Sequence, residues 1–188
     1  MCLISAKRAC EYAKVHHVSL KFNAVRKPVL LWWVDGSYSL ATCEGRTGWE
    51  LQIVDESEVN ESNFDDTPRS NVVAWRSHRQ VRKLASSSSS ELMALVEAIK
   101  LMPMYTKHIE HLWGCEPKVY FLTDSQPLLG WLRTKWITSD PKLQGMLDLV
   151  IDRLGECGSR VKVMYVRTDI QRADKHTKFI HASKLHPA

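Results

Sequence analysis

Four acidic residues stand where a folded chain would bring their carboxylates together. Asp35 ends the apolar run VLLWWV, and Asp124 ends the run KVYFLT. Glu91 opens the helical pattern ELMALVEAI, and Asp174 lies in IQRADKH, after the last run with strand periodicity. Crowded carboxylates repel one another, and divalent cations relieve this repulsion because hard oxygen ligands favour magnesium or manganese. The four acids therefore predict a metal site.

Two predicted strands would position two of these acids. The runs Val29–Ser39 and Lys118–Thr123 are continuously apolar, which is typical of strands buried on both faces. If these strands are parallel neighbours, Asp35 and Asp124 share the edge of the sheet where open α/β sheets place their sites.

A predicted helix would position the third acid. An apolar stripe follows the serine run Ser86–Ser90, so we expect a helix that begins there. At 100° per residue, Glu91 should lie beside Leu95 at the rim of the stripe, whereas Glu97 should face water. Pro103 should break or kink the helix.

Each acid also has a purely structural interpretation. Taken singly, Asp35 and Asp124 are ordinary turn residues. Glu91 stands at capping-box spacing from Ser88, which makes it a candidate for the N3 residue of a capping box at the start of the helix. Asp174 alone is no better a candidate than other aspartates near it. The metal-site hypothesis depends on all four contexts occurring together and in order.

The remaining periodicities predict an α/β domain with a five-stranded mixed sheet. The N-terminal stretch predicts a helix at Ile4–His17, a weak strand at Val18–Phe22 and a linker at Asn23–Lys27. The other predicted strands are Thr47–Val54, entered from a polar turn at Glu44–Arg46, Asn71–Ser77 and Arg160–Arg167. The other predicted helices are Met104–Trp113, Gln126–Thr134 and Pro141–Leu154.

Composition and charge favour a single globular domain with a polyanionic partner. The chain has 188 residues and a net charge of +5. The segment Asp55–Asp66 holds six of the 21 acids and no base, so 26 bases face 15 acids elsewhere. A basic body favours nucleic acid, although simple solubility is the alternative. We expect the acidic segment, up to Ser70, to be a long exposed loop.

Other classes of protein are disfavoured by the sequence. No apolar stretch reaches the roughly 18 residues needed to span a bilayer, and Met1–Cys10 has no signal-peptide core. The five cysteines are odd in number and lie far apart, which argues against a disulfide framework or a zinc site. We therefore expect an intracellular protein without membrane partners.

Two clusters of basic residues are candidates for contact with phosphates. The first is a predicted connector with Arg76, His78, Arg79, Arg82 and Lys83. The second contains Arg133 and Lys135 and lies beside Trp131 and Trp136. A solvated surface is the alternative for the first cluster, and we expect the two tryptophans to belong to the core.

Four segments in order resemble a known family. VDGSYS, SSELMALVEAI, YFLTDSQPLL and QRADKHTK are similar to the D-E-D-D set of ribonuclease H. Together with GRTGWELQIV and VVAWRSHRQVRK, they most resemble the ribonuclease H domain of copia-type (LTR) retrotransposon Pol polyproteins. AKRACEYAKVHHVSLKF resembles the piece that joins the reverse transcriptase to this domain. The resemblance implies a connector at 1–27, a ribonuclease H-like domain at 28–180 with helices on both faces of the sheet, and a polar tail at 181–188.

Carried over by position, the resemblance makes Asp35, Glu91, Asp124 and Asp174 catalytic metal ligands. It implies two Mg²⁺ ions, with Mn²⁺ as the alternative, and cleavage of the RNA strand in an RNA/DNA hybrid. It also implies a reverse transcriptase portion as partner, in the cytoplasm, a virus-like particle or the nucleus. Two alternatives remain open, namely an inactive nucleic-acid-binding remnant of the domain and a nuclease of this fold that cuts DNA.

The chain departs from the family pattern in three places. Bacterial relatives place a histidine in the loop before the last aspartate, whereas VRTDIQRAD has none, and we do not assign that task to His176. The acidic segment resembles an insertion between strands. The helix that usually follows the last aspartate is expected to be truncated or absent.

Overall fold

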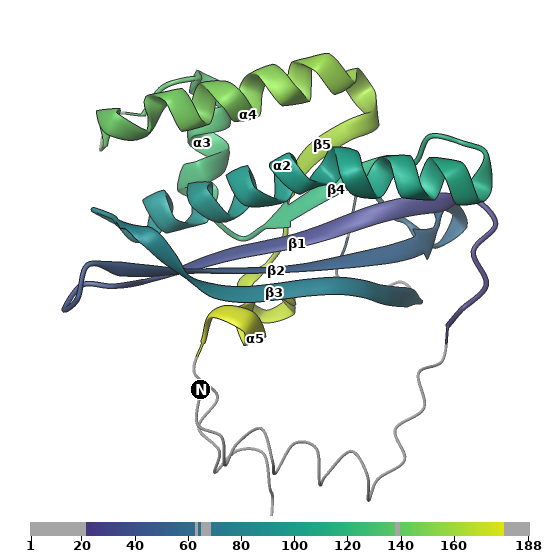
Figure 1. Ribbon diagram of the computed structural model, residues 1–188, viewed down its shortest axis with the longest axis horizontal. Helices are drawn as coiled ribbons and strands as arrows, with labels where there is room; N and C mark the ends of the chain where they lie inside the picture. Colours follow the sequence, from purple (N-terminus) through teal and green to yellow (C-terminus); the bar gives the residue numbers. More distant parts are fainter. Residues whose placement is uncertain (1–21, 63, 65–68, 138–139, 179–188) are drawn as a thin grey trace, which may run out of the picture.

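The structure, a computed structural model, describes residues 22–62, 64, 69–137 and 140–178. The expected helix at Ile4–His17, most of the strand at Val18–Phe22 and the tail at 181–188 lie outside these residues. A five-stranded mixed sheet forms the centre of the fold, and helices cover both of its faces (Figure 1). The predicted fold class is therefore confirmed.

The sheet has the order β3-β2-β1-β4-β5. β1 (Pro28–Ser39) pairs antiparallel with β2 (Glu44–Asp55) and parallel with β4 (Lys118–Thr123). β2 pairs antiparallel with β3 (Ser70–Lys83), and β4 pairs parallel with β5 (Val161–Tyr165). The continuous apolar run of β1 follows from its central place, because both of its faces are covered.

Successive residues of β1 belong to two different cores. Trp32 lies in the larger core, and its ring contacts Trp49 at 5.1 Å and Tyr105 at 5.4 Å between centroids. This core lies beneath α2 (Ser87–Trp113), α3 (Gln126–Thr134) and α4 (Gln144–Cys157). Trp33 points to the opposite face, where a smaller core forms near α5 (Asp174–Thr177). In Figure 1, α2 and α5 accordingly lie on opposite sides of the sheet.

Two of the predicted strands are longer than their sequence patterns indicate. β2 begins at Glu44, so the predicted turn Glu44–Arg46 is strand. β3 continues to Lys83, so the predicted basic connector is the second half of that strand. Polar residues replace the apolar alternation there because their side chains pair with polar groups of the neighbouring elements. Gln80, for example, donates from Nε2 to Thr47 Oγ1 at 2.9 Å.

The α2 helix also differs from its prediction. It runs as one helix through Pro103, whose side chain is exposed, and Thr106 Oγ1 lies 3.1 Å from the carbonyl oxygens of both Met102 and Pro103. Its N-cap is Ser86, whose hydroxyl accepts from the Ser89 N–H at 3.2 Å. The predicted capping box of Ser88 with Glu91 is therefore wrong.

The acidic segment is attached to the body rather than extended into solvent. Glu56 forms ion pairs with Lys27 at 2.5 Å and Lys118 at 2.8 Å. Glu61 accepts from the Tyr120 hydroxyl and pairs with Lys162 at 2.6 Å. Phe64 of the same acidic segment is buried against the ring of Tyr120. Most of the described residues of this segment are exposed, as expected, but the expectation that it does not pack is wrong at Phe64.

Candidate active site

Three of the four predicted acids meet at one edge of the sheet. Asp35, Glu91 and Asp124 each offer a carboxylate oxygen, and these oxygens lie within 4.8 Å of one another. Asp35 lies on β1, and Asp124 directly follows β4, its parallel neighbour. Glu91 is contributed by the first turns of α2, which runs along one face of the sheet (Figure 1). The predicted convergence of the two strand ends and the helix is therefore present.

The close approach of α2 to β1 depends on Gly36. A Cβ atom at this position would lie 2.3 Å from the carbonyl carbon of Ser90 and 2.5 Å from the backbone nitrogen of Glu91. The Ser90 hydroxyl donates to the Ser37 carbonyl at 2.7 Å and joins the two elements. Gln80 Nε2 donates to the Ser90 carbonyl at 3.0 Å. The serine run is thus a helix start packed against the sheet, which places Glu91 over the strand ends.

The site favours protonated carboxyl groups when no cation is bound. Burial, followed by the charges of Asp35 and Asp124, raises the pKa of Glu91 to about 10. Burial also raises the pKa of Asp35, although the hydrogen bond from Thr177 opposes this shift. Both shifts reflect the cost of holding negative charges together away from water.

The donor set fits a hard divalent cation. All three groups are carboxylates, and Glu91 Oε2 is buried without a hydrogen-bond partner among the described residues. A buried carboxylate oxygen with no partner is costly unless a positive charge occupies its vicinity. A cation held by Asp35, Glu91 and Asp124 would remove both this cost and the mutual repulsion.

The fourth predicted acid, Asp174, lies beside this cluster but outside it. Asp174 is the first residue of α5, and its carboxylate pairs with Lys178. Its charge raises the pKa of Asp35, so the two groups are close enough to interact. In the same short helix, Thr177 donates its hydroxyl proton to Asp35 Oδ2. The structure thus places α5 against the cluster but does not bring the Asp174 oxygens within its 4.8 Å spacing.

A buried carboxylate holds α5 on the sheet. Glu50 of β2 is 1% exposed and forms an ion pair with Lys175 at 2.5 Å, and His176 Nε2 lies 3.2 Å from the same carboxylate oxygen. These partners, together with Gln52, lower the pKa of Glu50 to about 2 although its burial acts in the opposite direction. Next to it, a Cβ atom on Gly48 would lie 2.6 Å from Thr177 Cγ2. The small residue and the contacts of Glu50 together set the distance of α5 from β2.

Gln171 is a site residue that the sequence analysis did not select. Its side-chain amide donates to the Val34 carbonyl at 3.1 Å and to the Leu122 carbonyl at 3.3 Å. It therefore joins β1 and β4 just before Asp35 and Asp124. Gln171 opens the quoted motif QRADKHTK, which could have indicated it, as it could have indicated Thr177.

The order of the strands and the placement of the helices are similar to those of solved ribonuclease H structures. LC11-RNase H1, isolated from compost by a metagenomic approach, matches with a TM-score of 0.55 at 16% identity, over 81% of this chain and 94% of that one. The same protein in complex with an RNA/DNA hybrid matches with a TM-score of 0.54 at 15% identity, over 79% and 93%. The N-terminal RNase H domain of rv2228c from Mycobacterium tuberculosis was solved as a fusion with maltose binding protein. It matches with a TM-score of 0.52 at 14% identity, over 80% of this chain and 91% of that one.

The chain has the ribonuclease H fold. A scan against protein-family models and a search of curated proteins both return no match. The likeness therefore comes from the shared architecture. None of the described helices is both long and apolar enough to cross a membrane.

On this ribonuclease H fold, three of the predicted basic residues pair with acids of the chain itself. Arg76 and His78 lie 3.4 Å and 2.6 Å from carboxylate oxygens of Glu97. Arg79 pairs with Glu44 at 2.7 Å. Glu97 also accepts from the Trp49 indole N–H at 3.0 Å, so the expectation that Glu97 faces water is wrong. The carboxylate instead ties α2 to β2 and β3.

The other predicted basic residues lie on the surface. Arg82 and Lys83 end β3 and line a shallow hollow together with Lys142. Arg133 lies in the last turn of α3, and Lys135 caps that helix in the left-handed conformation with φ of 58°. The neighbouring Trp136 is 58% exposed, so its assignment to the core is wrong. Trp131 packs at the margin of the larger core.

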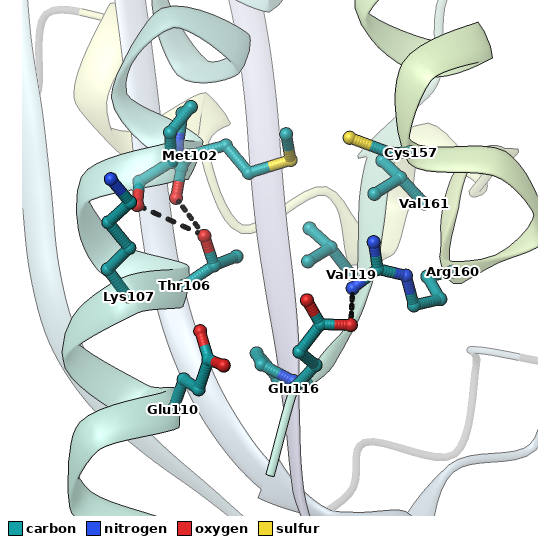
Figure 2. A pocket seen from close by; sticks show the side chains of 11 residues that line it. Met102, Thr106, Lys107, Glu110, Glu116, Val119, Cys157, Arg160 and Val161 are labelled. Atoms are coloured by element: carbon teal, nitrogen blue, oxygen red, sulfur yellow. Dashed lines mark hydrogen bonds and ion pairs between the residues drawn. The ribbon is translucent and has the colours of Figure 1, made fainter.

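A separate pocket lies at the other end of the ribonuclease H fold. Figure 2 shows its lining, which includes Met102, Val119 and Cys157, with an ion pair between Glu116 and Arg160 at its rim. These residues belong to the second half of α2, the start of β4 and the end of α4. The pocket is therefore remote from the carboxylate cluster at the strand ends.

Proposed function

We propose that the chain is a ribonuclease H-type endonuclease that hydrolyses the RNA strand of RNA/DNA hybrids. The observation that carries this proposal is the convergence of Asp35, Glu91 and Asp124 at the edge of the sheet. The fold adds support, because it is shared with LC11-RNase H1, which has been solved in complex with an RNA/DNA hybrid.

The residues of the chain have distinct tasks in this proposal. Asp35, Glu91 and Asp124 would hold divalent cations, proposed to be two Mg²⁺ ions with Mn²⁺ as the alternative, and Asp174 would complete the set from α5. The chemistry supplied by such cations is activation of a water and stabilisation of the leaving 3′ oxygen. No side chain has to act as nucleophile. Thr177 fixes the orientation of the Asp35 carboxylate.

We propose further that the domain belongs to a copia-type retrotransposon Pol polyprotein, with a reverse transcriptase portion as its partner. The support is the order of the motifs VDGSYS, SSELMALVEAI, YFLTDSQPLL and QRADKHTK in this chain. Such a protein would act in the cytoplasm or in a virus-like particle, with the nucleus as the alternative.

The first experiment incubates the purified chain with a hybrid labelled on its RNA strand, in Mg²⁺. We expect cleavage of that strand, and we expect Asp124→Asn to slow it about 10²- to 10³-fold because a ligand charge is lost. Asp152→Asn is the matched control, because it removes an exposed aspartate of α4. Preferential cleavage of duplex DNA would instead favour a DNA nuclease. Salt-sensitive binding to the hybrid without cleavage would favour an inactive remnant.

A further inference from the structure

A groove runs along the α5 side of the sheet, on the face opposite α2. It is lined by residues of β2, β3 and α5, among them Arg46, Trp75, Ser77, Lys175, Thr177 and Lys178. Figure 1 shows α5 beneath β3 on this side of the sheet. The Ser77 hydroxyl donates to the His176 carbonyl and thereby joins the two walls of the groove.

Trp75 stands out among these residues because it is a large aromatic side chain on an edge strand, 66% exposed. Its cross-strand partner in β2 is Glu50, whose carboxylate is already engaged by Lys175 and His176. The indole is therefore not needed to fill a core. An exposed aromatic ring beside cations is a typical platform for stacking a nucleic-acid base.

The charges that face the groove favour an anionic occupant. Arg46, Lys175 and Lys178 line it, and Lys175 pairs with Glu50 while Lys178 pairs with Asp174. The side chains of Lys175 and Lys178 are 51% and 61% exposed, whereas those of Glu50 and Asp174 are only 1% and 24% exposed, so the groove presents mainly the cations to solvent. A phosphate backbone is the polyanion that matches such a lining.

The groove is continuous with the carboxylate cluster. Thr177 lines the groove and also donates to Asp35. In the sheet register, Ser77 lies opposite Gly48, which lies opposite Asp35. Trp75 lies two residues from Ser77 along β3. Two strand spacings across the sheet and two residues along the strand together give a distance of about 12 Å between Trp75 and Asp35. Stacked nucleotides rise about 3.4 Å each, so this span corresponds to roughly three to four nucleotides.

We propose that this groove binds a single-stranded nucleic-acid segment that continues from the hybrid, with one base stacked on Trp75. This inference rests on the proposed function for the location of the hybrid. A single strand is the fitting occupant because bases inside a duplex already stack on both neighbours, whereas an unpaired base offers a free face to the indole ring. Arg46 and Lys175 contact the backbone phosphates of this segment.

Binding of labelled single strands of about eight nucleotides tests the groove directly. We expect Trp75→Ala to weaken binding about tenfold, measured by fluorescence anisotropy at fixed salt. Trp75→Phe should retain most of the affinity because it keeps an aromatic face. Leu112→Ala, which truncates another highly exposed apolar side chain at the far end of α2, is the control and should bind as the wild type does.

Cleavage assays then connect the groove with the carboxylate site. Hybrids with a single-stranded extension should show a lower KM than blunt hybrids of the same sequence, and Trp75→Ala should remove this advantage. Equal single-strand binding by the wild type and Trp75→Ala would overturn the proposal. In a further outcome, the wild type cleaves no hybrid while its single-strand binding still depends on Trp75. This result would reject the proposed function, but the groove would remain assigned as a single-strand binding site.

Discussion

At the scale of single residues, Glu91 couples the site to pH. Its folded-state pKa of about 10 lies far above its ordinary value of 4.5, because the carboxyl is buried beside two other acids. The folded chain without cations therefore keeps this proton where the unfolded chain loses it. Stability that is fully present below pH 4.5 must fall as the pH rises from 4.5 toward 10. A cation needs the ionised carboxylate, so its binding must displace the proton.

We predict that Mg²⁺ binding releases about one proton near neutral pH. The apparent affinity for Mg²⁺ should rise up to about tenfold for each unit by which the pH increases toward the folded-state pKa of Glu91. Calorimetric titration in two buffers of different ionisation enthalpy measures the proton release. Glu91→Gln should abolish the release, whereas Glu156→Gln, on the exposed end of α4, should not. Binding that is independent of pH would contradict the assigned protonation state.

At the scale of elements, the short helix α5 matters because it connects the carboxylate cluster with the rest of the sheet. It carries Asp174 and Thr177, and it has only four residues. So short a helix is not stable by itself. The contacts of buried Glu50 with Lys175 and His176, and the close approach over Gly48, attach α5 to the sheet. Glu50 is therefore a positioning residue for α5.

Glu50→Gln should lower the free energy of unfolding by about 1–3 kcal/mol, because Lys175 and His176 both lose the carboxylate that they contact. The sign of the pH effect follows from the lowered pKa of about 2. The carboxylate contributes stability above pH 4.5, and this contribution is lost as the pH falls toward 2. Denaturant unfolding should therefore show a steeper acid loss in the wild type than in the variant.

The same substitution should also lower kcat more than it raises KM, because Thr177 would no longer be held against Asp35. Glu58→Gln, in the exposed turn after β2, is the matched control. Unchanged cleavage by a destabilised Glu50→Gln chain would show that Glu50 supports the fold without positioning the site.

The elements also show what a sequence can predict and what it cannot. Strands β1 and β4 were predicted because both are buried on two faces, and this burial requires continuous apolar runs. The second half of β3 was missed because it is polar. Its polar side chains are stabilised by partners such as Glu97, which lies on another element. Asp35 and Asp124 could be predicted because each follows an apolar run, and Glu91 because it opens the helical pattern ELMALVEAI. The role of Gln171 depends on two carbonyls of different strands, so no hydrophobic periodicity encodes it, and only its place in the motif QRADKHTK points to it.

At the scale of the whole molecule, the acidic segment and the basic body are arranged unevenly. Glu56 pairs with Lys27 and Lys118, which stand at the starts of β1 and β4, and Glu61 pairs with Lys162 near the start of β5. These acids therefore neutralise cations at the end of the sheet remote from the carboxylate cluster. Arg82 and Lys83 at the end of β3 take no part in these three pairs and lie closer to the site, where a polyanionic substrate would approach.

Substitution of Arg82 and Lys83 tests this uneven distribution of charge, because both residues lie at the end of β3 beside the start of α2. The double variant Arg82→Ala/Lys83→Ala should raise KM for the hybrid severalfold with little change in kcat. It should also reduce the slope of the logarithm of the binding constant against the logarithm of the salt concentration by about one to two. The reason is that about one counterion fewer is released on binding for each phosphate contact that is lost. A control pair at the remote end, Lys107→Ala/Arg153→Ala, removes the same charge and should leave the slope unchanged. Equal slopes for the two double variants would mean that net charge alone, rather than its location, governs binding.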